Sequence, residues 1–292
     1  MFLDTARDYL ANWPIAALQV VVVAAFVAAF WYLVNALTSF DDNAEIITRG
    51  NAGYMIQRLS LSAALVVGML NSLEYRYDEI GWSALTNLLL EGAWVFVALL
   101  VARVVVDKVV LLRVDNVAAM REGNVAIGVV EAGFYLGLGL ILNGSLIGSS
   151  PDWQTGLAST VVFAVLGLLV VIGVYFLHDL VTRGLVRRGI AAGSLPAAFE
   201  IGGILVAVSL VVRVGVAGDF TGWGAGLAAF AATAVIAVVT LYLFRFLVDL
   251  VILRGVTVAS IQREGQVVAA GLMSGLFVVI ALPVATVVAA QL

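Results

Sequence analysis

Residues 120–139 read MREGNVAIGVVEAGFYLGLG, a polar turn followed by an apolar run that contains one carboxylate, Glu131. The apolar run continues to residue 148. It is long enough for a helix to cross a bilayer, since a crossing takes about 20 mainly apolar residues. The polar turn also recurs, because REGN at 121–124 returns as REGQ at 263–266, 142 residues later. The stretch therefore predicts both a membrane-spanning helix and an internal duplication.

The composition of the whole chain is that of an integral membrane protein. Of the 292 residues, 63% are hydrophobic and 12% are charged, and the mean hydropathy is +1.12, outside the usual range of soluble domains. The chain has no cysteine and one histidine, His178, which argues against disulfides, haem and zinc. We therefore expect no cofactor, no metal and no enzymatic activity. The net charge of −4 is not gathered into a basic patch, so no nucleic-acid partner is expected.

Eight segments are long and apolar enough to span a bilayer, which predicts an all-α fold, a polytopic membrane bundle. They cover residues 14–38, 52–72, 82–110, 125–148, 153–178, 194–215, 222–252 and 266–290.

The distribution of basic residues predicts the orientation of these spans. Most arginines lie in the links that follow the odd-numbered spans, and such links usually face the cytoplasm. Both termini are therefore expected outside. Tryptophans open the odd-numbered spans on that outer side, where indoles favour the headgroup level; they are Trp13, Trp82, Trp153 and Trp223. The N-terminus lacks the basic start and cleavage site of a signal peptide, so we expect it to be retained.

The tryptophans recur about every 70 residues, as expected for an internal repeat. We predict four units of two helices, each with a span inward, a short polar link and a glycine-rich span outward. The units pair into two tandem halves, residues 1–150 and 151–292. Because a two-helix unit keeps its orientation when repeated, this is a parallel repeat.

Three charged residues fall at one depth when the units are aligned. Arg58, Glu131 and Glu200 each lie seven residues past the turn into an even-numbered span, about 10 Å along the helix axis. The fourth unit has Met273 there. Charged groups in hydrocarbon usually face the bundle interior and pair, so we expect the two carboxylates to share the guanidinium. One hypothesis is a proton or cation site; the alternative is an ion pair that only fixes helix register.

Glu91 breaks the internal symmetry, because its counterpart is Thr233. It is a candidate for the same ion or proton site. The alternative is that Glu91 reaches the outer headgroups or bonds a neighbouring helix.

The inner ends of the odd-numbered spans carry a further set of polar side chains. Arg103 and Asp107 stand one turn apart in the third span, as Arg245 and Asp249 do in the seventh. Long basic side chains of this kind can reach the interface, which favours a structural role. Asn35 and Asp179 occupy the position of Asp107 in the other two units. The alternative is that these residues form a polar ring, the cytoplasmic mouth of a pathway. An isolated histidine such as His178, next to Asp179, is more often incidental.

Glycines predict close packing of the even-numbered spans. Gly133-x-x-x-Gly137, the pair Gly202-Gly203 and Gly271-x-x-x-Gly275 let helix backbones approach one another. Gly50, Gly123 and Gly193 provide the turns into these spans. Short helices are expected in the links, because Asp41 and Asp115 begin patterns typical of helix caps.

The link and turn DNAEIITRGNA at 42–52, its second copy at 115–124 and the glycine-rich spans that follow resemble the YjfL-like inner-membrane family of bacteria. In the second half, Ala192-Gly193 and Gly265-Gln266 stand where that family has Gly-Asn. The resemblance implies two-helix repeats in the bacterial inner membrane, no established function, and a setting of envelope-stress proteins.

Two functions remain open from the sequence. The first is transport, in which four units surround a polar site near the midplane and the charged residues relay a proton or cation. The second is a membrane scaffold or sensor, whose basic link at Arg183, Arg187 and Arg188 docks a cytoplasmic envelope-stress partner or anionic lipid. A homodimer is a further expectation, since shorter relatives would need to self-associate to reach four units.

Overall fold

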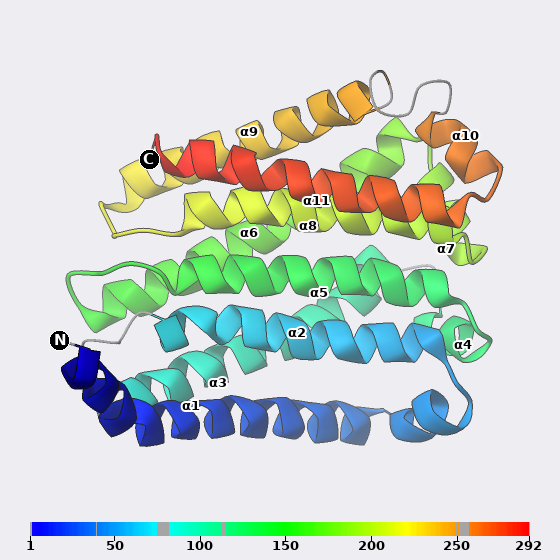
Figure 1. The fold of residues 1–292 in the computed structure, drawn as a ribbon. Helices are drawn as coiled ribbons and strands as arrows, with labels where there is room; N and C mark the ends of the chain where they lie inside the picture. The colour runs from blue at the N-terminus through cyan, green and yellow to red at the C-terminus, as the bar shows by residue number, and fades with distance from the viewer. Residues whose placement is uncertain are drawn as a thin grey trace.

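Helices make up most of the chain, and no strand occurs among the residues that the structure, a computed structural model, describes: 2–38, 40–74, 82–111, 115–248, 250 and 257–291 (Figure 1). The long helices are α1 (Phe2–Leu37), α2 (Ala52–Glu74), α3 (Trp82–Val105), α5 (Val125–Ser145), α6 (Trp153–Val181), α8 (Leu195–Val216), α9 (Trp223–Leu247) and α11 (Val267–Ala289). The short ones are η1 (Ala44–Thr48), η2 (Val106–Val110), α4 (Asn116–Arg121), α7 (Leu185–Ala191) and α10 (Val258–Arg263).

The eight long helices coincide with the eight predicted spans, and each is long and apolar enough to cross a membrane. The fold is thus the predicted membrane bundle, and the chain is a multi-pass membrane protein. The main difference is at the first span, which was expected to begin at residue 14. Helix α1 begins at Phe2 and continues through Pro14.

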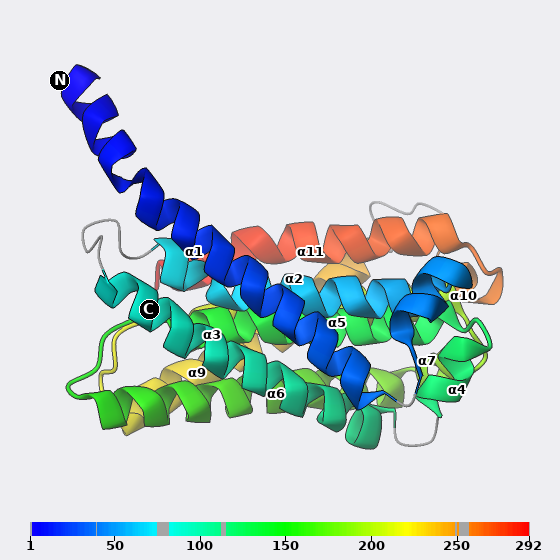
Figure 2. The same ribbon diagram turned by 90° about the horizontal axis from the view of Figure 1, so that it is seen from below.

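The helices form two layers, with the four units side by side in a row. Helices α2, α5, α8 and α11 lie next to one another and run in the same direction (Figure 1). Behind them α3 packs on α2 and α5, α6 on α5 and α8, and α9 on α8 and α11; α1 flanks α2 and α3 (Figure 2). The expectation that four units surround a central site is therefore wrong.

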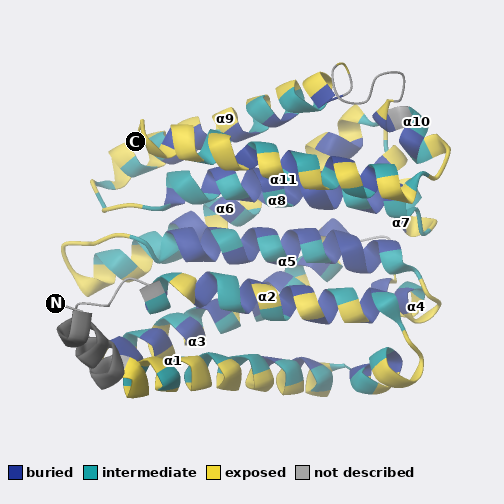
Figure 3. Ribbon diagram, in the orientation of Figure 1, coloured by how far each residue is buried: buried dark blue, intermediate teal, exposed yellow. Residues whose placement is uncertain are grey.

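The core lies in the middle of the row. In the most apolar stretch of α5 and of α8, 78% of the residues are buried, against 11% in α1 (Figure 3). The outer helices expose apolar side chains such as Val268 and Val279, as expected of helices that face lipid.

Glycines set the spacing within the row. A Cβ at Gly128 would lie 2.4 Å from the carbonyl oxygen of Gly53 in α2, and a Cβ at Gly133 would lie 2.7 Å from the Cα of Gly202 in α8. Backbones in such contact leave no room for a side chain, which confirms the close packing predicted for α5. The prediction is wrong for Gly271 and Gly275 of α11, where a Cβ would meet no described atom within 4 Å.

Short helices and glycine turns close one end of the bundle, called the link end below; it carries η1, α4, α7 and α10 (Figure 1). Asp115 caps α4 by accepting a hydrogen bond from the backbone of Ala118. Positive φ angles at the predicted turn residues Gly50, Gly123 and Gly193 then direct the chain into the next span. The opposite end, called the termini end, carries the chain termini and the loops between α5 and α6 and between α8 and α9 (Figure 1).

Candidate functional site

Arg58, Glu131 and Glu200 are all buried, as predicted, but each has its own partner. The Arg58 guanidinium forms an ion pair with Asp42, which precedes η1. Both side chains are at most 2% exposed. The guanidinium also lies 5.7 Å from the ring centre of Trp31, a distance at which cation and ring attract. The expectation that two glutamates share this guanidinium is therefore wrong, because Asp42 from the link supplies its carboxylate instead.

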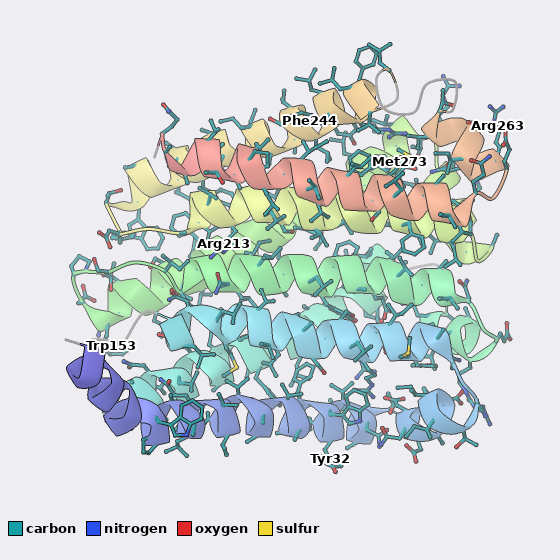
Figure 4. All side chains as sticks on the ribbon, in the orientation of Figure 1. Tyr32, Trp153, Arg213, Phe244, Arg263 and Met273 are labelled. Atoms are coloured by element: carbon teal, nitrogen blue, oxygen red, sulfur yellow. The ribbon has the colours of Figure 1, made fainter. Side chains whose placement is uncertain are left out.

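Glu131 occupies the interface between α5 and α2. Its side chain is fully buried and accepts a hydrogen bond from the amide of Gln57, the residue before Arg58. The other carboxylate oxygen, Oε1, has no hydrogen-bond partner among the described residues, and no salt bridge to Glu131 occurs among them. Glu131 is thus a carboxyl group held inside the bundle by a neutral donor. Its counterpart Met273 is buried in α11 (Figure 4).

Glu200 of α8 is surrounded by donors from three other helices. Its Oε1 atom lies 2.9 Å from Nη2 of Arg245 in α9 and 3.1 Å from Nε2 of His178 in α6. The amide of Gln262 in α10 donates to Oε2. Because α10 belongs to the link end and Glu200 lies close to the start of α8, this cluster lies toward the link end and not at the midplane.

Sequence reasoning missed part of the Glu200 cluster. His178 is fully buried, and its Nδ1 atom lies 3.5 Å from the Tyr242 hydroxyl and 3.4 Å from the Arg245 guanidinium. It is therefore a central member of the cluster and not an incidental residue. Arg245, which was expected to reach the interface, pairs with Glu200 toward the link end. No local pattern marks either contact, since the partners come from separate helices.

Three of the inner-end side chains tie an odd-numbered span to the link that follows. The three bonds join Asn35 Oδ1 to the Asp42 N–H at 2.9 Å, Asp107 Oδ1 to the Asn116 amide at 3.2 Å, and Asp179 Oδ1 to the Arg187 N–H at 3.1 Å. These contacts favour the structural alternative over a shared mouth. Arg103 lies half-buried at the same end of α3, and Asp249 lies outside the described residues.

Two cavities open at opposite ends of the bundle. At the link end a cavity of about 440 Å³ is lined by Arg245 and Gln262, two of the side chains that hold Glu200. None of Asn35, Asp107 and Asp179 lines it. At the termini end a larger cavity of about 690 Å³ includes Glu91 in its wall.

Glu91 bonds a neighbouring helix, because the Ser72 hydroxyl of α2 donates to its carboxylate. This contact was one of the alternatives proposed for it. The rest of the larger cavity is lined by residues of the two loops at this end, among them Ser149, Ser150 and Thr221, and by apolar residues such as Phe163.

The termini end also joins the two halves. Arg213 of α8, labelled in Figure 4, donates a hydrogen bond of 2.7 Å to the Asn143 side chain of α5. In the loops, the Ser149 hydroxyl and backbone N–H both donate to Asp219. These two bonds, the hydroxyl first, lower the pKa of Asp219 below its ordinary value, because they stabilise the ionised carboxylate. The loop contact therefore persists at neutral pH.

The chain matches a single protein family twice, over residues 8–146 and 152–288; the family is described as Domain of Unknown Function (DUF350). Each match covers four of the long helices, which is consistent with two tandem halves. No curated protein and no solved structure matches the chain. Since the matches together span most of the sequence, the chain belongs to the DUF350 family and carries its domain in two consecutive copies.

Proposed function

We propose that the protein moves protons across its membrane and that Glu131 is the group that carries them. The observation behind this proposal is the environment of Glu131, fully buried with only a neutral amide as donor among the described residues. A buried carboxyl without a cation can take up and release a proton, and ionisable residues inside membrane spans commonly serve such relays.

The two cavities support this proposal, because they approach Glu91 and the Glu200 cluster from opposite ends of the bundle. The larger cavity reaches Glu91, and the smaller one reaches the partners of Glu200. Between them, α5 and α8 pack through Gly133 and Gly202 with no space for a side chain. Such packing favours protons over larger cations, since protons can pass along hydrogen bonds without an open pore.

Proton flux into liposomes tests the proposal. The purified chain is reconstituted with a pH-sensitive dye inside the vesicles, and a pH gradient is imposed with valinomycin and potassium present to clamp the membrane potential. We expect wild type to dissipate the gradient faster than empty liposomes. Glu131→Gln keeps the size of the side chain but holds no exchangeable carboxyl proton, so its flux should fall to the empty-liposome rate.

Glu122→Gln is the matched control, because Glu122 is exposed in the turn before α5. This variant should keep the wild-type flux. Wild-type liposomes that are no leakier than empty ones would contradict proton transport, as would a Glu131→Gln variant with full flux.

A second candidate is a membrane scaffold or sensor that recruits a partner at the link end. The observation that favours it is the exposed basic link, in which Arg183 and Arg188 project from the bundle. The resemblance to the YjfL-like family adds a bacterial inner membrane and an envelope-stress partner to this candidate. It requires the link end to face the cytoplasm.

Orientation can be measured directly, because the chain has no cysteine. Single cysteines are introduced at two exposed positions, Ser150→Cys in the loop before α6 and Glu122→Cys in the link before α5. We expect a membrane-impermeant maleimide to label Ser150→Cys in intact spheroplasts, and to label Glu122→Cys only after lysis. The reverse pattern would place the termini in the cytoplasm and the link end outside. It would therefore contradict the scaffold candidate, which requires a cytoplasmic link end.

A further inference from the structure

The cavity at the link end has the composition of a lipid headgroup site. It is an open cavity lined by the ends of α6 and α9 and by the short helices α7 and α10, and its volume is about 440 Å³. One part of its wall is apolar, with Val181, Leu185 and Phe246. The other part is polar and includes the guanidinium-bearing residues Arg183 and Arg245. A phospholipid presents the same two chemistries next to each other.

The cavity also lies where a headgroup would lie. Val181 is the last residue of one candidate span, and Phe246 is the next to last of another. Arg183 and Leu185 follow directly in the link. The wall therefore changes from hydrocarbon-facing helix to polar link at this level, which is the position of the headgroup layer.

Part of the positive charge near the cavity has no acidic partner among the residues that the structure describes. Arg187 pairs with Asp179 at 3.5 Å, and Arg245 is taken up by Glu200. Arg183 forms no salt bridge with any described residue. The Arg188 guanidinium donates a hydrogen bond of 2.9 Å to the backbone carbonyl of Arg183. Arg183 thus brings to the cavity wall a guanidinium that forms no salt bridge with a described residue, and the hydrogen bond from Arg188 holds a second cation close to it, so an anion would be attracted.

The backbone of Arg183 is a second, independent feature. Its φ angle is 55°, and it is the one non-glycine residue with positive φ among those described. A long side chain is disfavoured in this conformation, and such strain tends to occur at ligand sites. Glycine would adopt this conformation without steric cost. An arginine at this position is therefore unfavourable for the backbone.

We propose that this cavity binds the phosphate headgroup of an anionic phospholipid. Arg183 supplies the primary contact with the phosphate, since a guanidinium pairs well with phosphate oxygens. Val181, Leu185 and Phe246 contact the start of the acyl chains. Free phosphate would satisfy only the charged part of the wall, whereas a lipid satisfies both parts. The inference is independent of the proposed proton transport.

Thermal unfolding of the full chain in neutral detergent tests the site. The probes are short-chain phosphatidylglycerol, short-chain phosphatidylcholine and glycerol phosphate at equal concentration. We expect phosphatidylglycerol to raise the wild-type Tm, and the other two to have little effect. Equal shifts with phosphatidylglycerol and phosphatidylcholine would overturn the proposal. A glycerol phosphate shift as large as that of phosphatidylglycerol would overturn its lipid part.

Arg183→Gly is the decisive variant, because glycine keeps the positive φ while removing the guanidinium. The phosphatidylglycerol shift should be lost in this variant and kept in Arg49→Ala, which removes another exposed arginine of the link end. If Arg183→Gly does not fold, Arg183→Asn replaces it, since asparagine also tolerates this conformation. A full shift in a folded Arg183 variant would overturn the site.

Discussion

Asp42→Ala is expected to destabilise the protein by about 3–5 kcal/mol, the usual cost of removing one member of a buried ion pair. Asp42 is the carboxylate that neutralises Arg58, and both are almost completely buried. Without Asp42 the buried guanidinium would keep its contact with the Trp31 ring but lose its carboxylate, and a ring contact cannot make up for the lost hydration of a buried cation. The midpoint of denaturant unfolding in micelles measures the loss.

The double variant Asp42→Ala/Arg58→Met separates charge from packing. It removes both charges, so much of the lost stability should return, since replacing a buried pair by apolar groups is often neutral. Glu122→Ala serves as control, because Glu122 is exposed, and it should change stability by less than about 0.5 kcal/mol. A double variant as unstable as Asp42→Ala would show that the ion pair is not the cause.

The sequence predicts the parts of this structure that depend on local pattern. Apolar length gives the eight spans, and the glycine turns at Gly50, Gly123 and Gly193 follow from the repeat. Burial of Glu131 and Glu200 is predicted as well, because a carboxylate that faces lipid costs free energy however the helices are arranged. These properties belong to one helix at a time.

The partners of the charged residues could not be predicted, because they depend on how the units stand beside one another. Alignment of the repeats gives the depth of a residue in the membrane but not which residue of the next unit lies beside it. Units arranged in a row bring one set of side chains together, and units arranged in a ring would bring together another. Gln57 and Arg58 are adjacent in sequence, yet the first turns to Glu131 and the second to Asp42. His178 meets Glu200 only because α6 lies behind α8.

Gly133→Ala is expected to lower the free energy of unfolding by about 1–3 kcal/mol, the usual cost of overpacking. The new methyl group would lie 2.7 Å from the Cα and 2.9 Å from the carbonyl oxygen of Gly202. Both are backbone atoms, which cannot rotate away, so α5 and α8 must separate to admit the methyl group. That separation would loosen the interface between the two halves. Denaturant unfolding in micelles measures the change.

Gly275→Ala is the matched control, because Gly275 stands in α11 at the position that Gly133 has in α5, one repeat of 142 residues later. A Cβ at Gly275 would meet no described atom within 4 Å. The same substitution should therefore be neutral or stabilise by up to about 1 kcal/mol, since alanine favours the helix more than glycine does. Equal destabilisation in both variants would mean that α11 is also closely packed at Gly275, against another molecule such as a second copy of the chain. If backbone contact between α5 and α8 fixes the spacing of the row, the free energy of unfolding should fall in Gly133→Ala and not in Gly275→Ala.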